Sequence, residues 1–469
     1  MEFSNILSKL NGFVWGSPML CLLVGTGIFL TLRLRFLPWR NLGYAIKSLF
    51  IKEPERDHAQ GDISSFQSLM TALAATIGTG NIVGVATAMV SGGPGALIWM
   101  WISALFGLST TYCESVLAVK YRERNDKGEM AGGPMYTMKN AIRIPGLGKL
   151  LAVFFSFFTV MASFGIGNMT QANSISQAVG STFAWPSWYT GFAIMILIFA
   201  VLVGGIKCIG RVCSIIVPFM GILYFLAGLL VIVANYQNLP SGIAEIFKMA
   251  FSVKSVAGGV GGTITATVFS SMRWGISRGV FSNEAGLGSA PIAAAAARTD
   301  SASRQGYINM TGTFFDTMII CSITGLVIIS SGVLGMQDAN GVLITGVELT
   351  ILAFSTVWGE RGGWLITISI ALFAFATLLG WEYYGEKALE YLCRNNYMIK
   401  LYRLLFCLMT YVGATKSLEA VWGFSDTMNG MMIIPNLISL LLLSGEAARE
   451  CFDYQMQINL TFRAKADKM

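Results

Sequence analysis

The sequence predicts an all-α polytopic membrane protein with about 11 transmembrane helices, arranged as a 5+5 inverted repeat after one extra N-terminal helix. Hydrophobic residues make up 54% of the 469 residues, charged residues make up only 12%, and the mean hydropathy is +0.62. A soluble chain of this length would need far more charge to cover its surface. The apolar runs are long and continuous, which favours helices over the short alternating strands of a barrel.

Runs of about 20 apolar residues place the spans. They cover roughly 12–33, 66–90, 95–119, 149–179, 188–206, 212–236, 258–292, 307–334, 363–391, 398–413 and 417–445. The run 12–33 is interpreted as a retained extra helix, because it lacks a basic leader and is followed by "RLRFLPWR" in place of a cleavage site. We expect a single transmembrane domain over 1–469. In it, 66–236 and 258–445 are the two repeats and 446–469 is a cytoplasmic tail.

The basic residues predict an outside N-terminus and a cytoplasmic C-terminus. This orientation leaves five of the 32 lysines and arginines outside, as the positive-inside rule requires. The net charge of +7 is spread over loops, which fits contact with a lipid bilayer and argues against nucleic-acid binding. Two outside stretches, 241–254 and 345–358, are amphipathic and short, so we expect helices lying along or dipping into the outer face.

Cysteine and histidine usage argues against a metal centre or an enzyme. The eight cysteines show no CxxC pair, so neither a disulfide framework nor a metal site is expected. The single histidine, His58, lies in the polar segment "EPERDHAQGD" and is interpreted as a solvated loop residue. A membrane-embedded enzyme would need a Ser/His, His/Asp or HExxH arrangement, and the single histidine lies in a loop. A channel would need a continuous polar pore, whereas the polar residues cluster at mid-span.

The second span contains "ATIGTGNIVG", residues 75–84, with weak helix formers and polar side chains near the bilayer midplane. These are Gly78, Gly80, Gly84, Thr79 and Asn81. Glycine costs about 1 kcal/mol relative to alanine inside a helix, so three in seven residues favour local unwinding. Freed carbonyls can hold a cation there, and amide N–H groups can hold a carboxylate. The alternatives are a small-residue packing face and, less favoured, a nucleotide-binding loop, which lacks a preceding strand.

The seventh span carries a second interruption, "MRWGISRGVFSNEAGLGSAP" (272–291), with four glycines and a proline. We expect the unwound part at Gly275. Interrupted segments at corresponding positions of two halves are a sequence pointer to a transporter site.

Five motifs give a specific resemblance. "GGPGALIWMWISALFG" (92–107) closely resembles the signature of the alanine or glycine:cation symporter family, with Ile98 where phenylalanine is usual. "ATIGTGNIVGVA", "GGPMYTM" (132–138), "RGVFSNEAGLGSAP" (278–291) and "GWEYYGEKALEY" (380–391) also resemble family motifs. The resemblance implies a leucine-transporter-like fold with an added N-terminal helix. It also implies secondary active, Na+-driven uptake of small neutral amino acids, alanine and glycine.

The resemblance implies a substrate site at the break of the second span. Thr79, Gly80 and Asn81 would cradle the amino-acid backbone, and Gln171 would contact it; the alternative for Gln171 is an interhelical hydrogen bond. Thr377 and Trp381 lie one turn apart on one helix face. The resemblance places both near the substrate, with Trp381 limiting side-chain volume; its alternative is an interfacial anchor. The complete expected set is Thr76, Thr79, Gly80, Asn81, Gln171, Gly275, Thr377 and Trp381.

For Na+, the leucine-transporter-like pattern suggests the carbonyls of Ala74, Ile77 and Phe373 and the hydroxyl of Thr377. Na+ is the expected coupling ion, with no organic cofactor and no obligatory protein partner. We expect a plasma-membrane location, which in a bacterium is the inner membrane. Na+ would stabilise an outward-open state, the amino acid would bind at the break, and the two halves would rock by alternating access.

Two acidic residues inside the spans, Asp316 and Asp426, are costly there and are candidates for coupling or gating. The alternative is a structural pair with Arg273 or Arg278. Coupling to H+ through either carboxylate stays open. Glu284 lies nearer the cytoplasmic end, as do Glu114 and Glu382, so these are expected to form inner-gate or structural pairs with the arginines.

Overall fold

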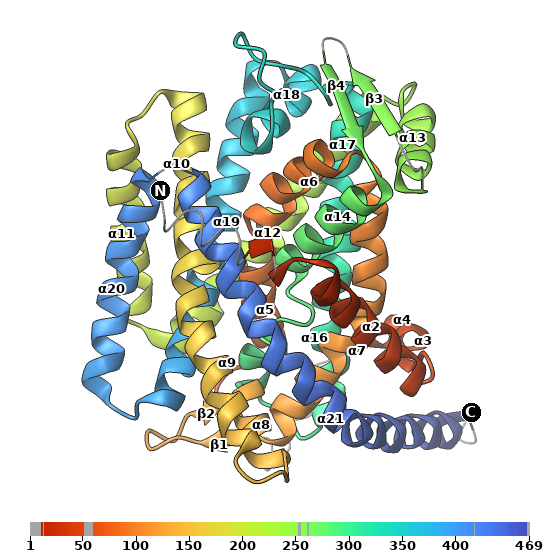
Figure 1. Ribbon diagram of the computed structural model, residues 1–469. Coiled ribbons are helices and arrows are strands. Elements are labelled where there is room, and N and C mark those ends of the chain that lie inside the picture. The colour runs from red at the N-terminus through yellow and green to blue at the C-terminus, as the bar shows by residue number, and fades with distance from the viewer. Residues whose placement is uncertain are drawn as a thin grey trace.

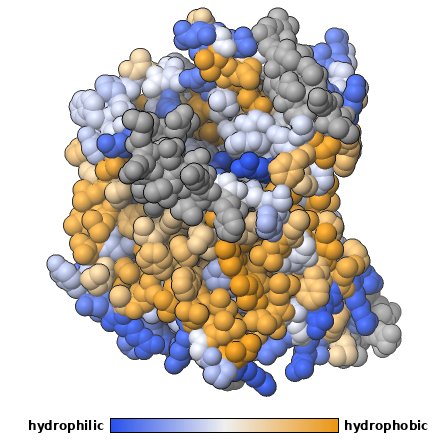
Figure 2. Space-filling view, viewed as in Figure 1, coloured by the Kyte–Doolittle hydropathy of each residue, from blue (hydrophilic) through white to orange (hydrophobic). Residues whose placement is uncertain are grey.

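The computed structural model describes residues 11–12, 14–50, 60–251, 255–259, 262–416 and 418–466. The described chain is a bundle of helices with two short antiparallel hairpins (Figure 1). Apolar residues predominate across the middle of the molecule and hydrophilic residues gather towards its two ends (Figure 2). This banding is what a chain that crosses a bilayer requires. His58 lies outside the described residues, and all eight cysteines are free thiols.

The helices follow in chain order. The first half has α2 (Ser17–Arg33), α3 (Leu37–Arg40), α4 (Leu42–Phe50), α5 (Ser65–Thr76), η1 (Gly80–Gly84), α6 (Val85–Gly92), α7 (Ala96–Lys120), α8 (Pro134–Ala141), α9 (Leu147–Phe164), η2 (Gly165–Met169), α10 (Thr170–Phe183), α11 (Ser187–Leu202) and α12 (Gly205–Ala234). The second has α13 (Leu239–Phe251), α14 (Val268–Asn283), α15 (Ala290–Ala295), α16 (Ala302–Thr313), η3 (Phe314–Cys321), α17 (Ser322–Ser331), α18 (Gly346–Trp358), α19 (Glu360–Leu392), α20 (Asn396–Thr415) and α21 (Leu418–Ala466). The hairpins pair β1 (Glu123–Arg124) with β2 (Met130–Ala131), and β3 (Ser255–Gly259) with β4 (Gly262–Ala266).

Seven helices among the described residues are long and apolar enough to cross a membrane, and the bent pair α5 and η1–α6 makes an eighth. α2, α11 and α18 are shorter apolar helices. The chain therefore has the several spans of a multi-pass membrane protein. The total of about eleven spans and the inverted repeat stay predictions.

The predicted break in the second span is confirmed. α5 begins with a capping box, in which Ser64 and Gln67 exchange hydrogen bonds of 3.1 Å. It ends at Thr76, and the chain bends by 47° before η1 and α6 continue. Ile77 leaves the helical region, with φ −76° and ψ 86°. The predicted glycine-rich stretch is thus where the helix changes direction.

The seventh span is also interrupted, but the predicted position is wrong. Gly275 lies inside the continuous helix α14, where a Cβ would come 2.3 Å from the carbonyl oxygen of Ala96. Gly275 therefore allows close packing of α14 on α7. The helix ends at Asn283, Glu284 takes a left-handed conformation with φ 58°, and α15 begins only at Ala290.

The predicted outer-face segments are helices. They are α13 and α18, which lie at the same end of the bundle in Figure 1; residues 252–254 of the first segment lie outside the described residues. Between the two ends, α19 packs against α5, α9, α10 and α12, and α14 packs against α6, α7 and η1. The bend of the second span is therefore enclosed by α10, α14 and α19.

Candidate functional site

The bend between α5 and η1 is held by the side chains of Asn81, in η1 itself, and of Gln171, on α10. The Asn81 Oδ1 accepts a hydrogen bond from the backbone N–H of Gly78 at 2.9 Å. The Gln171 Oε1 accepts one from the backbone N–H of Thr79 at 3.2 Å, and the Gln171 Nε2 donates to the carbonyl of Ile166. The bend thus has its freed amide groups directed at polar side chains, as unwound backbone inside a membrane requires.

Three oxygen atoms converge on one side of this bend. The hydroxyl of Thr377, on α19, lies 2.8 Å from the carbonyl oxygen of Ala74 and 3.1 Å from that of Phe373. A Cβ on Gly78 would come within 2.4 Å of this hydroxyl, so only glycine allows the approach. A hydroxyl has a single proton and cannot donate fully to both carbonyls. Three of the four expected Na+ ligands therefore meet in the structure, and the fourth, the carbonyl of Ile77, adjoins them in sequence.

The carboxylate of Asp316 lies on the other side of the bend, in η3. It accepts hydrogen bonds from the Asn81 Nδ2 at 2.7 Å, the Ser282 hydroxyl at 2.9 Å and the Thr317 hydroxyl at 2.8 Å. Asp316 is fully buried, and no lysine or arginine of the described chain forms an ion pair with it. The expected alternative, a pair between Asp316 and Arg273 or Arg278, is therefore wrong. Asn81 links this carboxylate to the bend.

Trp381 lies one turn beyond Thr377 on α19 and is fully buried, so the alternative role as an interfacial anchor does not fit. Its indole Nε1 donates to the Glu284 Oε1 at 2.7 Å, and the Ser289 hydroxyl donates to the other oxygen at 2.6 Å. A Cβ on Gly167, in η2, would come within 2.2 Å of the Trp381 Cβ. The indole is therefore fixed between η2 and the interruption of the seventh span.

Glu284 and Glu114 do not form the expected pairs with arginine. Glu284 accepts from Trp381 and Ser289, and Glu114 accepts from the Asn436 side chain at 2.6 Å. Glu382 does lie 3.7 Å from Arg403 and so has an arginine partner, but a role of this pair at an inner gate stays a prediction.

The remaining expected residues have the following contacts. The Thr76 hydroxyl bonds the carbonyl of Leu73 in its own helix at 3.3 Å. The Thr79 hydroxyl is buried without a hydrogen-bond partner in the described chain. Gly80 touches α14, since a Cβ there would come 3.0 Å from the Ser282 Cα. Arg273 lines a small cavity beside Arg278 and Asp426.

Asp426 forms an ion pair with Arg278, which is the structural alternative expected from the sequence. Its two oxygens accept from the two terminal nitrogens of Arg278 at 3.0 and 2.6 Å, and both side chains are buried. The Arg278 guanidinium also lies 4.9 Å from the ring centroid of Trp422. This bidentate geometry is that of a strong ion pair and ties α14 to α21.

Replacing Asp426 with asparagine is expected to destabilise the protein strongly, because the buried Arg278 charge loses its counter-ion, a loss of about 3–5 kcal/mol. Thermal unfolding in detergent measures the effect. The matched control is Glu123→Gln, which breaks a pair with Lys139 whose side chains are 30% and 35% exposed; about 0–1 kcal/mol is expected there. Equal losses for both variants would contradict a structural role for the Asp426 pair.

The sequence did not single out Ser282, Thr317 or Gly167. Ser282 lies in the motif "RGVFSNEAGLGSAP", which was the available signal. η1, η2 and η3 are π-helices, a form that often marks functional positions. Each of them supplies a residue to the region around the bend.

Comparison with known proteins gives consistent results. The model of the family described as "Sodium:alanine symporter family" matches residues 1–468. The sodium/alanine symporter AgcS of Methanococcus maripaludis is 51% identical over 450 residues, covering 96% of this chain and 97% of that protein. The "Probable sodium/glutamine symporter GlnT" of Bacillus subtilis is 34% identical over 454 residues, covering 97% and 91%. The crystal structure of MhsT in complex with L-phenylalanine has a TM-score of 0.57 at 13% identity, covering 84% of this chain and 99% of that one, and so shows a shared fold.

Proposed function

We infer, from the premise that this chain belongs to the sodium:alanine symporter family, that it imports alanine or glycine together with Na+. Membership also means that the chain is a membrane transporter and not an enzyme. The observation that carries the proposal is the bend at residues 77–79. There the backbone leaves the helical hydrogen-bonding pattern, so that its amide and carbonyl groups face Thr377, Gln171 and Asn81.

Na+ binds, in this proposal, where the oxygens of Ala74, Phe373 and Thr377 converge, with the carbonyl of Ile77 as a further ligand. A hard cation prefers such oxygen ligands. The site joins α5 to α19 through the 2.8 Å approach of Thr377 to Ala74. Binding of Na+ therefore favours the conformation in which these two helices are close.

The amino acid binds at the adjoining amides. Its carboxylate faces the start of η1 at Gly80, because the start of a helical segment attracts negative charge; the neighbouring N–H of Thr79 already donates to Gln171. Asn81 and Gln171 fix this backbone, and the Thr79 hydroxyl supplies a free polar group. Gly275 is left out of the proposed site, because it packs against Ala96 in a continuous helix.

Uptake of labelled alanine into proteoliposomes tests this function. We expect accumulation when Na+ is imposed outside and none when choline replaces it. Accumulation of alanine that is equal in Na+ and choline would contradict Na+ coupling.

A second coupling ion, H+, is favoured by one observation. The buried carboxylate of Asp316 receives only uncharged hydrogen-bond donors among the described residues. Such a group can take up and release a proton during a transport cycle. A pH jump without Na+ separates the two: accumulation driven by the pH gradient alone supports H+, and its absence supports Na+.

Replacing Trp381 with phenylalanine is expected to widen the amino-acid selectivity. The smaller ring opens space beside the bend, so competition by valine and leucine against alanine uptake should rise about tenfold. The matched control is Trp364→Phe on the same helix, at a tryptophan that is 57% exposed. Unchanged competition in a Trp381 variant that still transports alanine would contradict a role of Trp381 in limiting side-chain volume.

A further inference from the structure

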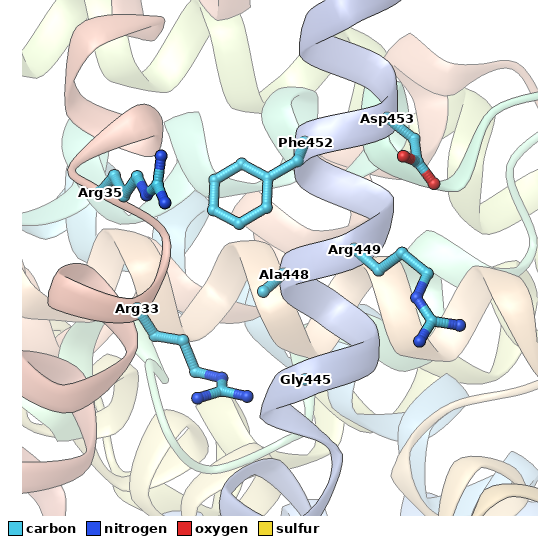
Figure 3. Close-up of a pocket in the computed structure, with 7 residues that line it drawn as sticks. All are labelled: Arg33, Arg35, Gly445, Ala448, Arg449, Phe452 and Asp453. Carbon is cyan, nitrogen blue, oxygen red and sulfur yellow. The ribbon is translucent and has the colours of Figure 1, made fainter.

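A cavity of about 420 Å³ lies between α2 and α21, and none of the residues that line it belongs to the bend. It is lined by Arg33, Arg35, Gly445, Ala448, Arg449, Phe452 and Asp453. Figure 3 shows Phe452 reaching from α21 toward Arg35, with Arg33 on the same side and Arg449 and Asp453 further round α21. The cavity thus gathers three guanidinium groups and one carboxylate at the end of α2.

The three arginines have no acidic partner within the described chain. Arg33, Arg35 and Arg449 are exposed, and none forms an ion pair with a described residue. Instead, the Arg33 guanidinium lies 5.9 Å from the Phe29 ring centroid, and that of Arg35 lies 5.4 Å from the Phe452 ring centroid. Asp453 offsets one of the three charges. The cavity therefore presents a net positive charge to an incoming group.

Arg35 has a backbone conformation that is unusual for an arginine. α2 ends in a Schellman motif, in which the N–H of Phe36 bonds the carbonyl of Thr31 and the N–H of Arg35 bonds that of Leu32, both at 3.0 Å. Arg35 takes the left-handed position, with φ 53°, that glycine fills in most such motifs. An arginine there is conformationally less favourable than glycine, as is the neighbouring Phe36 with φ 59°.

An apolar strip leads away from the cavity along the same helices. Phe29, Leu32 and Leu442 are 40%, 59% and 48% exposed. Such side chains face lipid in a membrane protein, and arginine at the end of a span faces the headgroups. A ligand that filled both parts would have an anionic head and a long apolar tail.

We propose that this cavity binds the phosphate of an anionic phospholipid, with an acyl chain along Phe29 and Leu32. Arginine suits the phosphate because its planar guanidinium donates two parallel hydrogen bonds to two oxygens. Gly445 leaves room for it, since a Cβ there would come 3.2 Å from the Arg33 Nη2. The proposal depends on the membrane location of the chain and not on the transported substrate.

Lipid titration of the purified full-length protein tests the proposal. Its thermal unfolding is followed while dioleoyl phosphatidylglycerol or dioleoyl phosphatidylcholine is added. We expect the unfolding temperature to rise with phosphatidylglycerol only. Arg35→Gly and Arg33→Gln should each weaken the apparent affinity for phosphatidylglycerol about fivefold, while Lys149→Gln, at an exposed lysine outside the cavity, should not.

Arg35→Gly separates binding from folding. Glycine suits the left-handed position, so without lipid this variant should unfold at the wild-type temperature or above it. An equal response to both lipids would overturn the proposal, as would wild-type phosphatidylglycerol affinity in both arginine variants. Equal stabilisation by inorganic phosphate alone would overturn the lipid as the ligand.

Discussion

Replacing Thr377 with valine is expected to raise the Na+ concentration needed for alanine accumulation roughly 10- to 100-fold in a protein that remains folded. Valine has nearly the shape of threonine but lacks the hydroxyl, which lies 2.8 Å from the Ala74 carbonyl and 3.1 Å from that of Phe373. Losing one contact to a charged ligand costs about 1.5–3 kcal/mol. The Na+ affinity should therefore fall roughly 10- to 100-fold, measured as the Na+ concentration that gives half-maximal uptake.

Thr367→Val is the matched control for this variant. Thr367 is buried on the same helix, but its hydroxyl bonds Thr182 at 2.7 Å and the carbonyl of Ala178, away from the bend. The Thr367→Val variant should unfold at a lower temperature, but its alanine uptake should keep the wild-type dependence on Na+ concentration. Thr377→Ser keeps the hydroxyl and should keep most of the transport. If Thr377→Val transports alanine with the wild-type Na+ dependence, the proposed Na+ ligands are wrong.

Replacing Asn81 with alanine is expected to weaken the binding of the alanine substrate strongly. The Asn81 side chain accepts from the Gly78 N–H at 2.9 Å and donates to Asp316 at 2.7 Å, so it fixes both sides of the bend. The substituted side chain at position 81 leaves the buried Gly78 N–H donor and the buried Asp316 acceptor without this partner, at about 1–3 kcal/mol each. We expect a fall in alanine affinity of at least about tenfold, measured by calorimetric titration in Na+.

The control for Asn81 is Asn309→Ala in α16. That asparagine is also buried, and it donates to the Ser115 hydroxyl at 2.8 Å, outside the bend. Both variants should unfold at lower temperatures, but only Asn81→Ala should bind alanine more weakly. Wild-type alanine affinity in Asn81→Ala would remove the bend from the substrate site.

The two broken spans show what composition can and cannot predict. At residues 77–80 the glycines cluster tightly, and the structure bends there. In the seventh span the helix breakers are spread over residues 275–291, so composition could not choose among them. The break falls at Glu284, a non-glycine in the left-handed region, which is fixed by Trp381 and Ser289. Tertiary partners decided that position, and Gly275 serves helix packing instead.

The residues of the candidate site also divide into those that the sequence predicted and those that only the tertiary contacts revealed. Sequence motifs singled out Gln171 and Thr377, and the structure brings both to the bend. The sequence offered Arg273 or Arg278 as a partner for either buried aspartate but could not choose among these pairs, because pairing depends on how helices rotate against one another. Asp426 meets Arg278, whereas Asp316 meets Asn81. The π-helices were missed as well, since one extra residue per turn leaves no compositional signal.

The most direct test of the central claim is reciprocal binding of Na+ and alanine to the purified protein. If both ligands bind at the same bend and favour the same conformation, each must raise the affinity of the other by the same factor, expected at roughly 5- to 150-fold. Titrating alanine at several Na+ concentrations, and Na+ at several alanine concentrations, measures both factors. The account predicts that Na+ raises the alanine affinity by the same factor as alanine raises the Na+ affinity. It predicts no rise in alanine affinity when K+ replaces Na+. Alanine affinity that is the same in Na+, K+ and choline would contradict it.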